Sequence, residues 1–559
     1  MLSWLQQYNR ESLVKDLVAA VIVTMLLIPQ SLAYAMLAGL PPEVGLYASI
    51  MPLVLYAAFG SSTTLSVGPV AVISLMTATS LAEVSELGIG SYLSGAITLA
   101  LMSGSISLLL GLFKFGFVAN FLSHTVISGF ITASGLIIGL SQIRHLLGIE
   151  GGGSTLVELV PATIANLDKT NLNTLVLGSC ALIALWFCKV YLSGVLVRAG
   201  MSARYSDLIA KISPVVVVVV SIGLSRGFGF AEKGVGMTGS IPSGLPKFQF
   251  AIPSLEMVEL LILPALMITL IGFVESISVG KTLAAKRREK VDPDRELVGL
   301  GMANLGSGVS GGFPVTGGFS RSVVNFDAGA ATQMASIFTA LGILVVCLFL
   351  TPYLYHLPKA VLAATIIIAV SSLIDLTMLR RTWAFSRSDF YAVSTTIIIT
   401  LLLGVEVGVA SGVLLSIWLH IYRTSTPHIA EVGLVSGTEH FRNVERFDVE
   451  TSARLLTLRQ DESLFFANAG QLEERILNEV FKRDSIAHVV IQCSAINEVD
   501  FSALEMLEDL NRKLFAQGVL LHLSEVKGPV MDRLKISGLF DHLKGKVYLT
   551  QYDAFKELS

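Results

Sequence analysis

Charged side chains are scarce in this sequence. Lys and Arg number 39 and Asp and Glu number 42 among 559 residues, so 14% of the chain is charged, whereas soluble proteins average about 25%. Apolar residues make up 53% of the sequence, and the mean hydropathy is +0.71. These values exclude a purely soluble multidomain protein, and we interpret the chain as a polytopic membrane protein.

Basic surfaces and cysteine motifs are also lacking. The net charge of -3 excludes the broad basic surface that nucleic-acid binding needs. The chain has four cysteines, and they share no short spacing, so the sequence indicates neither a zinc cluster nor a disulfide framework. No nucleophile–base pair or metal-ligand spacing points to an enzyme, and we expect no cofactor.

The few charges are unevenly distributed along the chain. Charged residues form about 27% of residues 428–559 but only about 11% of residues 1–427. The C-terminal part therefore has the composition of a soluble domain, and the N-terminal part must be largely buried in lipid. We predict a transmembrane domain over 1–427 and a cytoplasmic domain over 428–559.

Fourteen apolar segments in the N-terminal part could cross a bilayer about 30 Å thick. Eleven are long, and the three at 67–82, 296–312 and 317–327 are short and interrupted by Gly or Pro. Interrupted segments in corresponding halves of a chain are typical of the binding site of a secondary transporter. The long segments cover 14–38, 43–59, 91–112, 121–144, 172–190, 208–225, 256–280, 331–351, 357–374, 388–405 and 407–422.

Loop charges indicate the orientation in the membrane. With fourteen crossings both termini lie on one side. The loops on that side hold most of the Lys and Arg residues, including the run 286–290, whereas the opposite loops around 83–91 and 404–407 hold none. We therefore expect a multi-pass protein of the cell inner (plasma) membrane, with both termini cytoplasmic.

Alternating apolar runs in the C-terminal part predict a small sheet with helices packed on it. Strands are expected at Leu455–Leu458, Leu464–Ala467, His488–Gln492 and Val519–Ser524, and helices at Gln471–Phe481, Ser502–Phe515 and Val530–Phe540.

Glu275 lies within the apolar run Leu261–Val279. An ionised carboxylate there is costly unless it is paired, protonated or wetted by a cavity, so an acid inside the membrane is a candidate functional residue. A carboxyl in this position is suited to take up and release a proton. The structural alternative is an acid paired with a donor on a neighbouring helix.

Two Gly/Pro breaks lead into short apolar segments, one in each half of the chain. They are Ser66–Ala71, which contains Gly68 and Pro69, and Pro314–Arg321. A helix that begins at membrane depth offers free backbone N–H groups and the positive end of its dipole, which together favour an anion. Two such helix starts facing each other would form an anion site, and Arg321 would add a fixed positive charge. The alternative for Arg321 is a loop arginine that reaches to the membrane surface.

Pro29 interrupts the first long segment, where it frees a backbone carbonyl. Gln30 and Tyr34 are four residues apart and share a helix face, so they could line a cavity.

These motifs together resemble the sulfate permease (SulP) family of anion transporters, over nearly the whole chain. The resemblance rests on Ile28–Tyr34 followed by Ala38–Tyr47, on Gly60–Pro69, on Ser320–Ser322 and on the C-terminal part.

The resemblance implies an α-helical membrane protein of 14 transmembrane segments in 7+7 inverted repeats, with the fold of nucleobase transporters. Helices 1–4 and 8–11 would form a core domain, and helices 5–7 and 12–14 a gate domain. Half-helices three and ten would start near Pro69 and Phe319. The implied substrate-binding residues are Gln30, Tyr34, Pro69, Val70, Ala71, Phe319, Ser320 and Arg321. Glu275 matches the acid of helix eight in members that couple transport to a cation.

The C-terminal part resembles a STAS domain, with Val499–Leu504 at a strand-to-helix turn. Ser502 matches the serine that is phosphorylated in anti-sigma-factor antagonists, although Phe501 and Ala503 depart from the usual Asp-Ser-Ser-Gly pattern. Ser502 also stands where a helix N-cap is needed, and we favour that structural role over a regulatory phosphosite. The resemblance implies a homodimer with contact through these domains.

We therefore expect a secondary active anion transporter that moves sulfate together with a proton by an elevator-like mechanism. Sodium is an alternative coupling ion, since Ser276 and Ser278 could help to hold it. The protein could instead transport bicarbonate or a dicarboxylate, or exchange chloride. From a different functional class, it could be a membrane-tethered regulatory protein that has lost transport.

Overall fold

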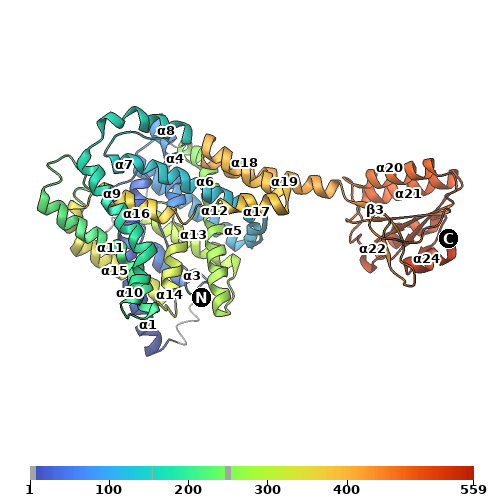
Figure 1. Ribbon diagram of the computed structural model, residues 1–559, viewed down its shortest axis with the longest axis horizontal. Coiled ribbons are helices and arrows are strands. Elements are labelled where there is room, and N and C mark those ends of the chain that lie inside the picture. The colour runs from blue at the N-terminus through green and yellow to red at the C-terminus, as the bar shows by residue number, and fades with distance from the viewer. Residues whose placement is uncertain (1–7, 122, 154, 246–252) are drawn as a thin grey trace. The chain divides into compact units, whose positions relative to one another are not determined.

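The computed structural model describes residues 8–121, 123–153, 155–245 and 253–559 (Figure 1). The chain forms two compact units, Met1–Ser416 and Ile417–Ser559, and the division falls within one helix. The functional boundary that we predict between residues 427 and 428 lies just beyond that helix and stays a prediction.

The first unit is built from helices. Each of the fourteen apolar segments overlaps at least one of them. Their bounds are α1 (Arg10–Leu37), α2 (Pro42–Tyr47), α3 (Met51–Phe59), α4 (Ala71–Leu87), α5 (Tyr92–Leu112), α6 (His124–Ser141), α7 (Ile143–Leu147), α8 (Leu156–Ala165), α9 (Leu172–Phe187), α10 (Ser193–Arg198), α11 (Ala203–Phe228), α12 (Leu255–Arg287), α13 (Pro293–Val309), α14 (Phe319–Asp327), α15 (Met334–Val345), α16 (Lys359–Val370), α17 (Thr377–Phe385), α18 (Arg387–Leu403) and α19 (Val405–Ser425).

Nine helical stretches of the described residues are long and apolar enough to cross a membrane. Some of them join two neighbouring helices, as in Leu172–Arg198, where a π-helical turn at Cys188–Leu192 connects α9 to α10. The membrane-spanning helical domain is thus present, and the count of fourteen crossings stays a prediction.

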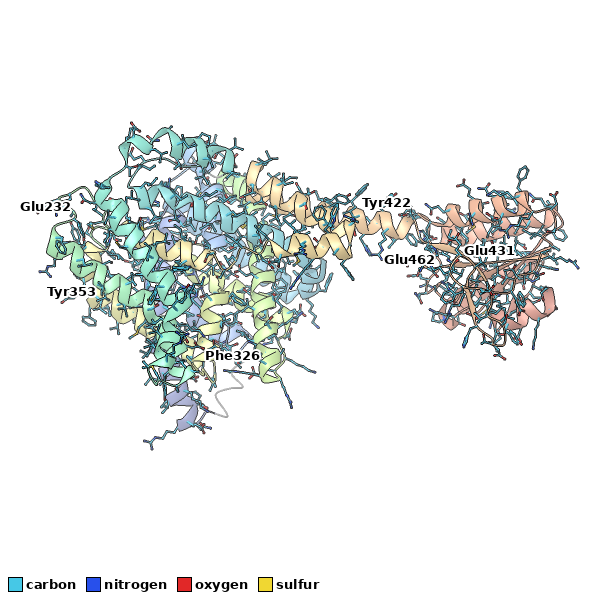
Figure 2. The ribbon with its side chains drawn as sticks, in the orientation of Figure 1. Glu232, Phe326, Tyr353, Tyr422, Glu431 and Glu462 are labelled. Atoms are coloured by element: carbon cyan, nitrogen blue, oxygen red, sulfur yellow. The ribbon has the colours of Figure 1, made fainter. Side chains whose placement is uncertain are left out.

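The second unit is a six-stranded sheet with helices on both faces. The strand order is β4-β3-β5-β6-β7-β8, with β5 to β8 parallel and β3 antiparallel to both neighbours. Glu431 of β3, labelled in Figure 2, accepts two hydrogen bonds from Arg483, at 2.7 and 2.8 Å. The strands are β3 (Ile429–Leu434), β4 (Phe441–Asn443), β5 (Leu455–Gln460), β6 (His488–Gln492), β7 (Leu520–Ser524) and β8 (Val547–Tyr548), and the helices are α20 (Ala469–Lys482), α21 (Phe501–Ala516), α22 (Gly528–Ile536), α23 (Leu539–His542) and α24 (Gln551–Leu558).

Alternation along β6 shows how the sheet is covered. Val489 and Ile491 join the core formed with α20, α21 and α22, whereas Val490 packs on the other face with Ala554 of α24. Successive side chains of a strand point to opposite faces, so both faces of this sheet are apolar.

Two predictions for the second unit are wrong. The strand expected at Leu464–Ala467 is a turn with a single bridge, because the Asn468 side chain accepts a hydrogen bond from the Phe465 amide and donates one to the Ser463 carbonyl. The helix expected at Val530–Phe540 is divided between α22 and α23, because Gly538 adopts a φ of +75°.

Small residues let helices of the first unit approach closely. A side chain at Gly301 of α13 would place its Cβ 2.7 Å from the Leu108 amide nitrogen of α5, and one at Gly104 of α5 would lie 2.8 Å from that of Leu305. Close backbone approach through glycine is a common way to pack helices in membranes, where apolar surface alone gives no driving force.

Two short strands bring the Gly/Pro breaks of the two halves together. β1 (Val67–Gly68) pairs antiparallel with β2 (Thr316–Gly317), with Val67 opposite Gly317. The amide of Asn304 on α13 fixes the second break, since it accepts from the Val315 amide at 2.8 Å and donates to the Val315 carbonyl at 2.9 Å. The starts of α4 and α14 therefore lie side by side.

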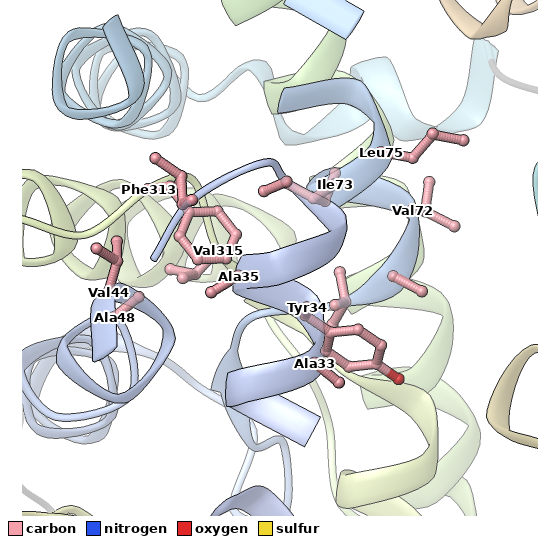
Figure 3. Close-up of a cluster of buried hydrophobic side chains, with 14 of the residues drawn as sticks. Ala33, Tyr34, Ala35, Val44, Ala48, Val72, Ile73, Leu75, Phe313 and Val315 are labelled. Atoms are coloured by element: carbon pink, nitrogen blue, oxygen red, sulfur yellow. The ribbon is translucent and has the colours of Figure 1, made fainter. Parts of the chain in front are cut away.

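An apolar cluster surrounds this crossing. Figure 3 shows Tyr34 and Ala35 of α1, Val72 and Ile73 of α4, and Phe313 and Val315 from the second break among the buried side chains of this cluster. Packing of α1 and α12 against both α4 and α14 completes the setting of the candidate site.

Candidate functional site

Two helix N-termini face the crossing of β1 and β2 without side-chain caps. The N-cap of α4 is Val70 and that of α14 is Gly318, and neither supplies a side-chain acceptor. The first N–H groups of a helix have no partner within it. Both ends therefore present open amides and the positive end of a dipole, which is the arrangement an anion requires.

Arg321 joins the two ends. It lies in the first turn of α14, is 1% exposed, and its Nη1 donates to the carbonyl oxygen of Pro69 at 2.8 Å. Its Nε and Nη2 are buried without a hydrogen-bond partner in the described part of the chain. An unpaired buried donor is costly, so these two nitrogens indicate a missing oxygen ligand.

Glycine makes room for this guanidinium. A Cβ at Gly318 would lie 2.9 Å from Arg321 Nη2, and one at Gly68 would lie 3.2 Å from Nη1. The Gly in each break therefore allows close packing around the arginine.

A cavity of about 60 Å³ lies at the two helix starts. It exceeds the roughly 10–15 Å³ that a single water molecule needs, so a small anion can be accommodated. All nine residues that the sequence proposes for substrate and ion coupling line it: Gln30, Tyr34, Pro69, Val70, Ala71, Glu275, Phe319, Ser320 and Arg321. Their role in binding stays a prediction.

A second cavity, of about 370 Å³, borders the first. The two share Gln30, Tyr34 and Ser320, together with Ala369 and Ser372. The larger cavity is lined by parts of α1, α9, α11, α14 and α16.

The end of α16 is a part of the site that sequence reasoning missed. Ala369, Val370, Ser372 and Leu373 all line the smaller cavity. They lie at the end of the apolar segment 357–374, far from its proline and its charge at Pro358 and Lys359, and only the Ser371–Ser372 pair beside them gave any signal.

Glu275 of α12 lines the same small cavity as Arg321. Its carboxylate makes no hydrogen bond to the described residues, so the structural alternative of an acid paired with a neighbouring donor gains no support. Apolar side chains of α6, including Val126 and Phe130, flank it on the far side. The acid therefore stands between an apolar wall and the cavity that contains the arginine.

Ser276 points away from the cavity toward β2. Its hydroxyl lies 2.8 Å from that of Thr316 and accepts a hydrogen bond from the Gly317 amide at 2.9 Å. These partners hold β2 against α12, and they weaken the expectation that Ser276 helps to hold sodium. No cluster of three or more His, Cys, Asp or Glu suited to a metal occurs among the described residues.

The N-cap role expected for Ser502 is wrong. Asp500 caps α21, since its carboxylate accepts from the Ala503 amide at 2.8 Å. The same carboxylate accepts from the Phe466 amide at 2.9 Å. Ser502 lies in the first turn of the helix with an exposed side chain. An Asp two residues earlier was the stronger candidate, because a cap must precede the first helical residue.

Comparison with known proteins places this geometry in context. The sulfate permease family matches residues 13–396, and the STAS domain matches residues 446–554. The chain is 34% identical to "Sulfate transporter 4.1, chloroplastic" of Arabidopsis thaliana, over 97% of this chain and 79% of that protein. It is 31% identical to "Probable sulfate transporter MT1781" of Mycobacterium tuberculosis, over 96% and 94% of the two chains.

A solved structure has the same fold. The murine Solute Carrier 26 family member A9 anion transporter, in the inward-facing state, superposes with a TM-score of 0.88 at 25% identity. The match covers 100% of this chain and 93% of the other.

Proposed function

The chain belongs to the sulfate permease family of membrane anion transporters, and from this premise we propose that it carries sulfate together with a proton. The observation that carries the proposal is Arg321, whose Nε and Nη2 are buried without a partner in the described residues, between two uncapped helix starts. An oxyanion supplies the acceptors that these donors lack.

Sulfate enters from the larger cavity and reaches the smaller one past Gln30 and Tyr34. The open amides of α4 and α14 and the free edge of the guanidinium then replace its water. The Pro69 carbonyl fixes Nη1 in advance, so less side-chain freedom is lost when the anion binds. Ser320, which lines both cavities, can donate a further hydrogen bond.

Proton coupling follows from the position of Glu275. An ionised Glu275 repels the dianion from the cavity that it shares with Arg321, and a protonated one does not. Binding of the proton and of the anion therefore favour each other, and by linkage the effect is reciprocal. The commitment of the Ser276 hydroxyl to Thr316 and Gly317 favours a proton over sodium.

Movement of the site across the membrane is the remaining step. Counted along the fourteen apolar segments, the proposed core is helices 1–4 (α1 to α5) and 8–11 (α12 to α15). Packing supports this core, since α13 packs on α3 and α5, and α1 packs on α14 and α15. The proposed gate is helices 5–7 (α6, α9 and α11) and 12–14 (α16, α18 and α19) of the same count. Packing supports this gate too, since α16 packs on α6 and α9, and α18 packs on α6. In an elevator-like cycle the core slides against the gate and turns the small cavity from one side to the other.

The orientation and assembly belong to the same proposal. Both termini lie in the cytoplasm, the protein resides in the cell inner (plasma) membrane, and it forms a homodimer through its STAS domains. The exposed Ser502 hydroxyl at the start of α21 is accessible for phosphorylation.

Purified full-length protein in proteoliposomes tests the proposal. We expect labelled sulfate uptake that rises when the outside is acid and is insensitive to a sodium gradient. Competition by bicarbonate, dicarboxylates and chloride separates the candidate substrates. Absence of any anion flux, with partner binding that depends on Ser502, would favour a regulatory protein.

Glu275→Gln tests the coupling. We expect sulfate uptake that no longer responds to the pH gradient but still shows exchange of sulfate for sulfate. Glu86→Gln, at the exposed end of α4, is the matched control. Uptake by Glu275→Gln that stays as dependent on the pH gradient as that of the control would remove the coupling role.

A further inference from the structure

The two half-helices of the site are each tied to another helix at a similar distance from their starts, through the tenth residue of α4 and the ninth and last residue of α14. On α4, the Ser80 hydroxyl lies 2.8 Å from Glu406 Oε1 at the start of α19. On α14, the final residue Asp327 forms an ion pair with Lys211 of α11. Each half-helix thus meets the anion site at its N-terminus and a polar partner from another helix about two and a half turns further along.

The two links occupy corresponding places in the proposed repeats. Among the fourteen segments, α4 and α14 are the third and tenth, and α11 and α19 the seventh and fourteenth. In a 7+7 inverted repeat, three corresponds to ten and seven to fourteen. The same contact therefore occurs twice, and inversion places the two copies toward opposite sides of the membrane. The antiparallel pairing of β1 with β2 agrees with such an inversion, because the two breaks run in opposite directions where they meet.

Asp327 is badly placed for the stability of its own helix. An acid at a helix C-terminus interacts unfavourably with the helix dipole. Asp327 therefore does not stabilise its own helix, and we look to its ion-pair partner for its role. The preceding residue, Phe326, labelled in Figure 2, is approached by the cations Arg287 and Lys286, whose charges lie 4.8 and 5.6 Å from its ring. Despite these neighbours on α12, the ion pair that Asp327 makes within the described residues is to Lys211 across the cavity wall.

The Lys211 link is the stronger of the two. It joins two full charges, and both side chains are about one-third exposed. The single proton of Ser80 is shared with the Met76 carbonyl at 2.7 Å, so its bond to Glu406 is the weaker one.

We infer that Lys211–Asp327 and Ser80–Glu406 are paired links between core and gate that stabilise the present conformation and set how readily the anion site changes the side it faces. This inference rests on the proposed transport function. The four side chains are positioning residues, because none of them lines the small cavity beside Arg321. Since α14 and α4 carry the site, any sliding of the core must break or stretch both links.

The test is a measurement of conformation alongside transport. In full-length protein whose native cysteines are replaced, Thr365→Cys on α16 reports access to the larger cavity through its rate of modification by a hydrophilic thiol reagent. The helix α16 carries neither link. Lys211→Met and Asp327→Asn are each expected to slow labelling about three- to tenfold and to change the maximal rate of sulfate uptake. Asp327 lines neither cavity, so Asp327→Asn should also leave the KM for sulfate within about twofold.

Two further variants separate a link from a merely structural effect. The double variant Lys211→Met/Asp327→Asn should slow labelling no more than either single variant, and the exchange Lys211→Asp/Asp327→Lys should restore the wild-type labelling rate.

The second link and an unrelated pair are tested in the same way. Ser80→Ala should also slow labelling, by about twofold. Glu11→Gln, which breaks the exposed pair with Lys15 at the start of α1, is the control and should change nothing.

The inference is overturned if folded Lys211→Met and Asp327→Asn, checked by their thermal unfolding, label at the control rate, or if the exchanged pair stays slow. The proposed function fails separately. If the wild-type protein transports no sulfate but the variants still slow labelling as expected, the inference about the two links stands and the proposal of sulfate transport is wrong.

Discussion

The two units of this protein differ in where their charged side chains lie: several are buried in the membrane unit, whereas those of the C-terminal unit are mostly exposed. In the membrane unit charges are few and several are fully buried, as with Arg321 at 1% and Glu296 at 0% exposure. In the C-terminal unit more than a quarter of the residues are charged, and typical ion pairs such as Arg512–Asp509 are 76% and 41% exposed. Burial decides the consequence, since exposed pairs contribute about 0–1 kcal/mol whereas a buried charge that loses its partners costs several.

The largest expected effect is on transport by Arg321→Gln. Loss of two charge-assisted hydrogen bonds to the anion, each about 1.5–3 kcal/mol, should lower sulfate uptake in proteoliposomes by about 100-fold or more. Arg512→Gln, on the exposed face of α21, should stay within about twofold of wild type. Uptake by Arg321→Gln above a third of the wild-type rate would show that the buried arginine does not bind the substrate.

Glu296→Ala should have the next largest effect, on folding of the membrane unit. Its carboxylate accepts hydrogen bonds from the Tyr56 hydroxyl at 2.7 Å and from the Ser61 and Ser62 amides at 2.8 and 3.0 Å. The Tyr56 hydroxyl and the Ser62 amide are buried and would remain unpaired, at a cost of about 3 kcal/mol or more. The midpoint temperature of thermal unfolding in detergent should be clearly lower for this variant than for the wild type. The matched change Glu498→Ala, in an exposed pair with Arg533, should cost under about 0.5 kcal/mol.

A pH effect of similar size is expected in the C-terminal unit at His522. Its Nδ1 accepts the Lys546 amide proton at 2.9 Å, so its own proton lies on Nε2, which faces His488 Nδ1 at 3.2 Å. Burial, followed by repulsion from His488, lowers the pKa of His522 to about 4. In the unfolded chain the pKa returns to about 6.5, and below that value the unfolded state binds the extra proton.

The stability contributed by neutral His522 is thus fully present above about pH 6.5 and is lost as the pH falls toward 4. The loss approaches about 3 kcal/mol at most. Urea unfolding of residues 417–559, followed by circular dichroism between pH 7.5 and 5, measures it. His522→Phe should flatten the dependence, whereas His440→Ala, an exposed histidine, should leave it as in wild type. Equal slopes for the two variants would contradict the assignment.

The smallest expected effect distinguishes Asp500 from Ser502. Asp500→Ala removes the N-cap of α21 and the acceptor for the Phe466 amide, and should lower the free energy of unfolding of residues 417–559 by about 1–2 kcal/mol. Ser502→Ala, at an exposed position, should change it by less than about 0.5 kcal/mol. The reverse order in urea unfolding would restore Ser502 as the structural residue.

Local chemistry made much of the site predictable. A carboxylate inside an apolar run, an arginine beside a glycine break and two interrupted segments are each unusual in a membrane, so Glu275, Arg321 and the starts of α4 and α14 could be singled out one by one. Residues without such a signal were missed. The end of α16 lines the cavity with Ala369 and Val370, which are ordinary apolar residues, and Asp500 was passed over because Ser502 matched a motif.

The sequence by itself determined the division into a membrane part and a charged C-terminal domain, the positions of the helical segments and the identities of the few intramembrane charges. These follow from composition and periodicity, which act over short stretches of chain. Only the tertiary structure decided that β1 and β2 pair across more than two hundred residues, that Arg321 reaches Pro69, and that Lys211 meets Asp327. Such contacts depend on how distant helices pack, and packing depends on shapes and glycine gaps on both partners at once.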